Sequence, residues 1–165
     1  MYRCFFILLI ACGLNSYALT DQVCFTPGEN CTGELVQSIN DAKHSILVQA
    51  YSFTSQPIAD ALVDAKQKGL DVRVILDKSQ VKAHNSVFGY LVNHRIPVWI
   101  DNRVAIAHNK VMIFDNQSVS TGSFNFTSSA QRRNAENLLI LNDVALAKQY
   151  TTNWYKPRKI SCDLR

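Results

Sequence analysis

The 165-residue sequence contains little glycine, proline or cysteine: six, four and five residues, respectively. A collagen-like chain needs glycine at every third position, and a disordered chain has far fewer hydrophobic residues than the 47% found here. The sequence also lacks internal repeats, low-complexity tracts and any cluster of cysteine, histidine and carboxylate residues at metal-site spacing. These absences leave an ordinary globular protein, for which we expect neither a metal ion nor another cofactor.

Long apolar runs are also missing, except at the start of the chain. Residues 1–18 combine a positive charge at Arg3, an apolar run from Phe5 to Ala11 and a small-x-small pattern ending at Ala18. The run is shorter than the about 20 residues that span a bilayer, so the pattern predicts a secretory signal peptide cleaved after Ala18. Residues 19–165 would then form one domain, exported to the periplasm or secreted.

The five cysteines are divided between this leader and the rest of the chain. Residues 9–12 (LIAC) resemble a lipoprotein cleavage box, which would make Cys12 a lipidated N-terminus, but the segment before them is very short. Cleavage after residue 18 leaves Cys24, Cys31 and Cys162, and an oxidising compartment favours one disulfide. Closing Cys24 to Cys31 would stabilise the fold by about 2.5 kcal/mol, and joining either to Cys162 by about 5 kcal/mol. The pairing stays open.

Hydrophobic periodicity predicts an α/β fold: one mixed, largely parallel sheet with helices on both faces. In the first half, helical spacing alternates with β-prone runs, which implies crossover connections between parallel strands. In the second half, a turn-prone segment at 115–117 separates two strands and adds antiparallel pairing. The predicted helices cover 33–42 (capped by Thr32), 57–69, 85–93 and 144–155 (capped by Asp143), and the predicted strands cover 45–53, 72–76, 96–100, 108–114, 118–121 and 136–141.

The segment from His108 to Phe126 carries the chemistry. Successive side chains of a strand alternate in direction, so His108 and Lys110 point to the same side. An imidazole beside a fixed ammonium suits an anionic phosphate, because the histidine can act as nucleophile or proton donor while the lysine neutralises the non-bridging oxygens. Ser123 and Asn125 share a direction in the same way and would add a hydroxyl and an amide as donors.

Other residues of this segment are predicted to be structural. Asp115 lies seven positions from His108, so an extended strand directs it to the opposite side, and we interpret it as a structural carboxylate. Gly122 would allow a close approach of the backbone. Phe124 and Phe126 alternate with the amide between them and are expected to pack into the core.

Together these residues resemble the signature of the phospholipase D superfamily, H-x-K-x4-D-x6-G-S-x-N. Every specified position is present: His108, Lys110, Asp115, Gly122, Ser123 and Asn125. The short chain is similar to the single-motif bacterial nuclease branch (Nuc type) over roughly residues 33–155. This resemblance implies a phospholipase D/nuclease-like fold and an exported, metal-independent phosphodiesterase that works as a homodimer. It also implies that Glu136 hydrogen-bonds the catalytic histidine.

The reaction itself also favours a homodimer. Cleavage through a covalent intermediate needs a nucleophile on one side of phosphorus and an acid at the leaving oxygen. Each chain supplies one histidine in such a setting, so a two-fold axis would bring both copies of His108 around one phosphate. One imidazole would form a phosphohistidine; the other would protonate the leaving alcohol and then activate water.

The chain has 17 basic and 13 acidic residues, a mild excess that permits an anionic partner without demanding one. We predict an endonuclease that cleaves DNA or RNA with little sequence preference. The first alternative is a phospholipase D that hydrolyses phospholipid headgroups, and the second is a noncatalytic nucleic-acid-binding module. Candidate contacts to the phosphate backbone are Lys78, Lys82, Arg103, Arg132 and Arg133.

Overall fold

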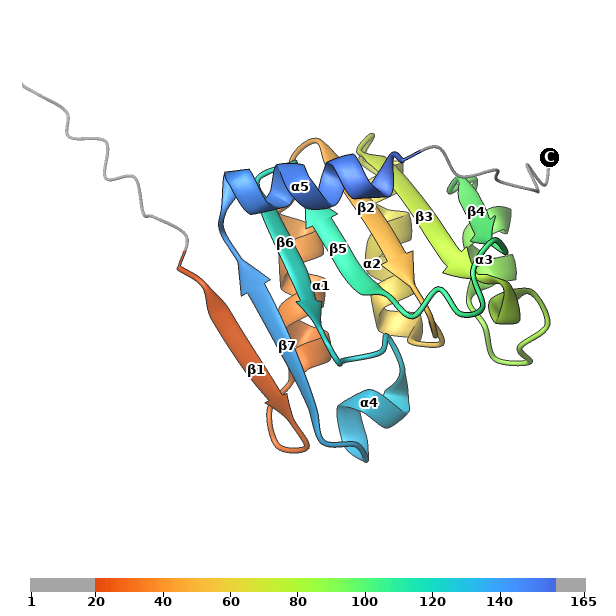
Figure 1. The fold of residues 1–165 in the computed structure, drawn as a ribbon, viewed down its shortest axis with the longest axis horizontal. Coiled ribbons are helices and arrows are strands. Elements are labelled where there is room, and N and C mark those ends of the chain that lie inside the picture. Colours follow the sequence, from red (N-terminus) through yellow and green to blue (C-terminus); the bar gives the residue numbers. More distant parts are fainter. Residues whose placement is uncertain (1–19, 157–165) are drawn as a thin grey trace, which may run out of the picture.

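A computed structural model describes residues 20–156 (Figure 1). The predicted signal peptide, with Cys12 inside it, and Cys162 lie outside these residues. Seven strands form one sheet in the order β1-β7-β6-β5-β2-β3-β4. The strands are β1 (Gln22–Thr26), β2 (Ser45–Ala50), β3 (Asp71–Asp77), β4 (Val98–Asp101), β5 (Lys110–Phe114), β6 (Ser118–Gly122) and β7 (Glu136–Leu141). The helices are α1 (Cys31–Asp41), α2 (Gln56–Gln67), α3 (Phe88–Asn93), α4 (Ser128–Arg132) and α5 (Val144–Trp154), with a short 3-10 helix η1 (Lys78–Val81).

The predicted mixed α/β sheet is confirmed, but its strands are mostly antiparallel. Among the described strands, β2–β3 and β3–β4 pair in parallel. The other four pairs, β2–β5, β5–β6, β6–β7 and β7–β1, are antiparallel. The prediction of a largely parallel sheet was therefore wrong. For β5 and β6 the reason is connection length, because they are joined by a tight turn and a parallel crossover needs a dozen residues or more.

Helices cover both faces of the sheet, as the sequence predicts. In Figure 1, α5 lies across the near face, while α1 and α2 lie behind the sheet. The larger core includes side chains from α1, α2 and α3 and the sheet face beneath them. On the other face, Trp154 and Ala147 of α5 pack on the sheet, and the Trp154 indole N–H donates to the Val48 carbonyl over 3.0 Å.

The structure confirms some of the predicted elements, corrects one predicted helix cap and adds two elements. The strand predicted over 136–141 and the helix predicted from residue 144 are found there, with Asp143 as its cap. The cap assigned to Thr32 was wrong: Asn30 caps α1 by accepting a hydrogen bond from the Gly33 amide. Strand β1 and helix α4 were missed, because each is only five residues long and lacks a clear apolar period.

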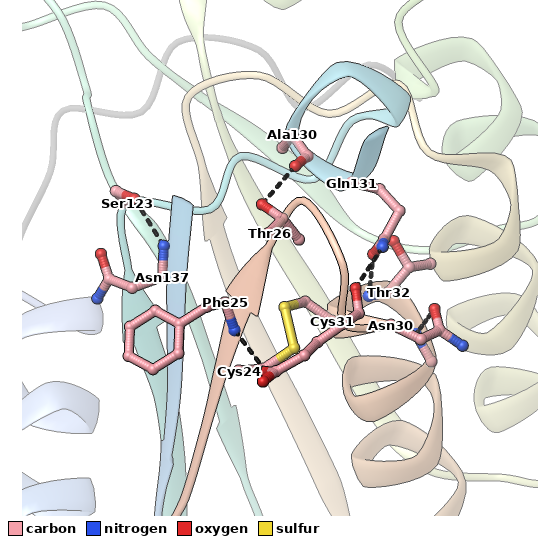
Figure 2. Close-up of a disulfide and its surroundings, with 12 residues drawn as sticks. Cys24, Phe25, Thr26, Asn30, Cys31, Thr32, Ser123, Ala130, Gln131 and Asn137 are labelled. Carbon is pink, nitrogen blue, oxygen red and sulfur yellow. Dashed lines mark hydrogen bonds between the residues drawn. A yellow bond between two sulfur atoms is a disulfide. The ribbon is translucent and has the colours of Figure 1, made fainter. Parts of the chain in front are cut away.

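A disulfide joins Cys24 of β1 to Cys31 at the start of α1. Both cysteines are buried. The structure thus selects the short-range pairing among those that the sequence left open, and this bond fixes the turn between the edge strand and the first helix (Figure 2).

Asp115 occupies the turn between β5 and β6 at a positive φ of 54°, a conformation that aspartate and asparagine tolerate. Its carboxylate accepts hydrogen bonds from the amides of Lys43, His44 and Ser45 at 2.7–2.8 Å, which ties the turn to the start of β2. Desolvation by burial acts to raise the pKa of Asp115, but these backbone hydrogen bonds outweigh it and the pKa lies below its ordinary value. Asp115 therefore lies at the opposite end of β5 from Lys110.

We expect Asp115→Asn to lower the free energy of unfolding by about 1–2 kcal/mol, because an amide presents one acceptor oxygen where the carboxylate presents two. Asparagine keeps the left-handed backbone, so the change isolates the hydrogen bonds. Since the pKa of Asp115 is lower in the folded state, its contribution is present above the unfolded-state pKa and is lost as the pH falls through the folded-state pKa. Urea unfolding at neutral and acidic pH measures this; equal stability of both proteins at neutral pH would contradict it.

Candidate active site

The predicted site residues meet at one edge of the sheet. At this edge β2, β3, β4 and β6 end, and β5 and β7 begin, because β5 and β7 run against their neighbours. An open pocket there is lined by His108, Lys110, Gly122, Ser123, Asn125 and Glu136. His108 lies two residues before the start of β5, and the Tyr51 amide at the end of β2 donates a hydrogen bond to the carbonyl of the intervening Asn109. The pocket lining is polar apart from glycine.

Lys110 is a charged residue that is almost fully buried. The residue is 7% exposed, its Nζ donates to the His108 carbonyl over 3.0 Å, and the ammonium lies 5.3 Å from the centre of the Tyr51 ring. Burial lowers the pKa of Lys110, and the charge of Glu136 opposes that shift. Among residues 20–156 no carboxylate forms an ion pair with it. The ammonium is therefore available to an anion in the pocket.

Ser123 and Glu136 form a hydrogen-bonded pair across the pocket. The Ser123 hydroxyl donates to Oε2 of Glu136 over 2.6 Å and accepts from the Asn137 amide over 3.1 Å, the contact drawn in Figure 2. The other oxygen of Glu136 accepts from the Asn134 side chain. The expected hydrogen bond between Glu136 and His108 is not among these contacts. Within this chain, Glu136 orients the serine, because β7 delivers its carboxylate to Ser123.

Gly122 is required where β6 approaches β7. Its φ is +142°, and a Cβ at this position would lie 2.3 Å from the Asn137 carbonyl oxygen. Any side chain would push the strands apart and displace the serine that follows. The close approach predicted for this glycine is therefore found, toward a neighbouring strand.

The residues around Asn125 alternate as the sequence predicts. Phe124 and Phe126 are fully buried, and Phe126 meets Phe53 edge-to-face at 5.6 Å between ring centres. This anchoring leaves Asn125 on the pocket side. Its Oδ1 is buried and has no hydrogen-bond partner in the described part of the chain. The amide thus has unused hydrogen-bonding capacity beside the buried ammonium.

The segment between Asn125 and Glu136 is supported by the disulfide-closed turn (Figure 2). Gln131 of α4 accepts from the Thr32 amide over 2.8 Å and donates to the Glu29 carbonyl over 2.7 Å. The Thr26 hydroxyl donates to the Ala130 carbonyl over 2.8 Å. Sequence reasoning missed these supports, and since all of them span about a hundred residues, no local pattern could have revealed them.

The structure does not bring the predicted basic contacts into the pocket. Lys78 and Arg103 follow the ends of β3 and β4; the Lys78 ammonium donates to the Val104 carbonyl, and Arg103 pairs with Asp101. Arg132 and Arg133 lie at the end of α4, where Arg133 bonds Ser129. These side chains sit at the same edge of the sheet, on two sides of the pocket. Lys82, just after η1, is exposed there as well.

Among residues 20–156, no group of three or more histidine, cysteine, aspartate and glutamate residues is placed to hold a metal ion. The same residues include no helix of the length and apolarity that a bilayer crossing requires. The pocket itself presents imidazole, ammonium, hydroxyl, amide and carboxylate groups.

A mixed α/β sheet that brings H-x-K and G-S-x-N residues into one polar pocket defines a phospholipase D-like domain. Residues 35–156 match the family model described as "Cardiolipin synthase, PLD-like domain". The chain belongs to this family, and the phospholipase D-like fold expected from the sequence is confirmed.

The curated relatives of this chain are named for different activities. The chain is 42% identical over 154 residues to Phospholipase D of Rickettsia prowazekii, a match that covers 90% of this chain and 75% of that protein. It is 32% identical over 116 residues to mitochondrial cardiolipin hydrolase of Canis lupus familiaris, covering 70% and 46%, respectively.

Two solved structures are similar over most of their length. Nuc from Salmonella typhimurium, a phospholipase D family member, is 39% identical with a TM-score of 0.76, and the match covers 82% of this chain and 91% of that one. NucT from Helicobacter pylori is 25% identical with the same TM-score, and the match covers 82% and 92%. The predicted likeness to the Nuc branch is thus confirmed.

We expect Lys110→Met to raise the free energy of unfolding by about 1 kcal/mol, because methionine fills similar space without burying an unpaired charge. Since burial lowers the pKa of Lys110, the gain is present at neutral pH and shrinks as the pH rises above the folded-state pKa. Urea unfolding measures it, with exposed Lys82→Met as the matched control, expected to stay within about 0.5 kcal/mol. A loss of stability in Lys110→Met alone would contradict the expectation.

Proposed function

We propose that this protein is an exported endonuclease that cleaves phosphodiester bonds of nucleic acids with little sequence preference. The observation that carries the proposal is an exposed His108 imidazole beside the buried, unpaired ammonium of Lys110, in an open polar pocket. Such a pocket fits a phosphodiester, whose two non-bridging oxygens share one negative charge. The basic residues at the same edge, outside the pocket, suit neighbouring phosphates of a long polyanion. The match to nearly the whole length of Nuc also supports it.

The reaction proceeds in two displacements at phosphorus. A ring nitrogen of His108 attacks, an N–P bond forms, and the P–O bond to the leaving alcohol breaks as that oxygen takes a proton. Water then attacks phosphorus and loses a proton to the base that protonated the leaving alcohol, a P–O bond forms, the N–P bond breaks, and the His108 imidazole is regenerated. Lys110 neutralises the non-bridging oxygens, and Ser123 and Asn125 contribute further polar contacts.

The proton donor in this scheme comes from a second copy of the chain. Within the described residues, His108 is the one histidine that lines the pocket. A base that attacks phosphorus on one side cannot protonate the oxygen leaving on the other, so the reaction needs a second imidazole. Because the pocket is open and His108 is exposed at its rim, a two-fold axis can place both copies of His108 at one phosphate.

A second candidate function is hydrolysis of phospholipid headgroups. It is favoured by the name of the Rickettsia relative and by two exposed aliphatic side chains, Val104 and Ile106, in the loop that precedes His108. The chemistry at phosphorus is the same for both substrates, so the substrates themselves must be compared.

We expect the purified protein to nick plasmid DNA and degrade single-stranded DNA with EDTA present, and to leave phosphatidylcholine vesicles intact. His108→Ala should lower the DNA rate at least about 10³-fold, because it removes the nucleophile. His94→Ala, a histidine outside the pocket, is the matched control. Choline release without DNA cleavage would favour the lipid function. DNA binding without cleavage would favour a noncatalytic module, and loss of activity in EDTA that a divalent ion restores would contradict the mechanism.

We expect His108→Ala subunits to inhibit wild-type subunits when both are co-expressed. If each site needs two copies of His108, activity falls with the square of the wild-type fraction, whereas independent monomers give a linear fall. Light scattering of the same samples reports the mass in solution. A linear fall, or a monomer with full activity, would contradict the homodimeric site.

A further inference from the structure

Tyr51 lies where β2 ends, directly beside the H-x-K segment. The preceding residue, Ala50, pairs with Lys110 in the antiparallel register of β2 and β5. The Tyr51 amide then donates to the Asn109 carbonyl over 2.7 Å. The side chain of Asn109 accepts from Gln49 over 2.9 Å. Since Asn109 separates the histidine from the lysine, the end of β2 holds the backbone between the two reactive residues.

The Tyr51 ring contacts both reactive side chains. Its centre lies 4.7 Å from that of the His108 imidazole, with the planes tilted by 60°, and 5.3 Å from the Lys110 ammonium. Aromatic pairs at such distances attract each other, and an aromatic face attracts a cation. Among the described residues the His108 imidazole has no side-chain hydrogen bond, so Tyr51 is the contact that restricts its orientation.

We propose that Tyr51 is a positioning residue for the reaction at His108. Its ring limits the rotamers of an otherwise exposed imidazole and directs it into the pocket. The same ring lies beside the ammonium of Lys110, so one aromatic side chain contacts a group that is already cationic and an imidazole that gains positive charge when its nitrogen attacks phosphorus. The ring carries this role, because both contacts are made to the ring; the hydroxyl is dispensable. The inference rests on the proposed nucleophilic role of His108.

A purely structural reading is that Tyr51 fills space where a strand ends. If so, Tyr51 should contact core residues, and its substitution should affect KM and kcat equally. The contacts of Tyr51 are instead made to two residues that line the pocket, while the neighbouring core position is taken by fully buried Phe53. The positioning role therefore has a kinetic signature of its own.

The test compares Tyr51→Leu and Tyr51→Phe with Tyr90→Leu as the matched control. Tyr90 also forms a ring pair with a histidine, His94, at 4.3 Å, but outside the pocket. Tyr51→Leu should lower kcat on DNA about 10-fold and leave KM within about 2-fold, since an aromatic contact that orients the nucleophile acts on the chemical step. Tyr51→Phe should retain the wild-type kcat, and so should Tyr90→Leu. A thermal unfolding transition for each variant would establish that it is folded.

A proton NMR spectrum without substrate provides a readout independent of activity. The imidazole signal that disappears in His108→Ala should be shifted by the ring current of Tyr51, should keep that shift in Tyr51→Phe and should lose it in Tyr51→Leu. If the wild type cleaves no phosphodiester, the proposed function fails while the NMR result still tests the contact. An unchanged kcat in folded Tyr51→Leu, equal losses in both Tyr51 variants, or an unshifted wild-type signal would overturn the positioning role.

Discussion

The arrangement of the site depends on how the positive charge of Lys110 is balanced. An ammonium removed from water must pair with a carboxylate, shift its pKa or await an anion. In this chain its close contacts are a carbonyl oxygen and an aromatic ring, neither of which cancels the charge. The carboxylate of Glu136 is near enough to act on its pKa, yet is hydrogen-bonded to Ser123. A bound phosphodiester would complete this arrangement, so the cost of burying the charge is recovered only when substrate is present.

The sheet topology explains why these groups converge. Strands β3 and β4 follow one another on one side of β2, and the chain then returns to the other side with β5, so the strand order reverses between β2 and β5. In α/β sheets, ligands bind in the crevice outside the strand ends at such a reversal. Here Tyr51 follows the end of β2, Lys110 begins β5, Ser123 follows the end of β6 and Glu136 begins β7. Four strands therefore deliver side chains to one edge without any long loop.

The sequence predicts the part of this site that depends on local geometry. Because side chains alternate along an extended chain, the sequence predicts that His108 and Lys110 lie on one side, and both line the pocket. The same alternation predicts buried Phe124 and Phe126 with Asn125 on the pocket side, as found. What could not be predicted depends on register between distant strands. Tyr51 becomes relevant only because Ala50 pairs with Lys110, and the partner of Glu136 is set by where β7 begins beside Ser123. No local period carries that information. The parallel share of the sheet was overestimated for the same reason, since pairing partners were inferred from element order alone.

The supports on the two sides of the pocket differ in kind. On the His108 side, the segment is held by β2, a central strand buried among its neighbours. On the Glu136 side, α4 is a single short helix that forms little structure by itself, because so few residues cannot offset the cost of helix nucleation. Its fixed points are Thr26 of β1 and the Glu29–Thr32 segment that follows, and within residues 20–156 β1 is an edge strand that pairs with β7 alone. The Cys24–Cys31 bond closes that segment and restricts the conformations open to it. The disulfide thus steadies the segment that delivers the carboxylate, although no sulfur atom lines the pocket.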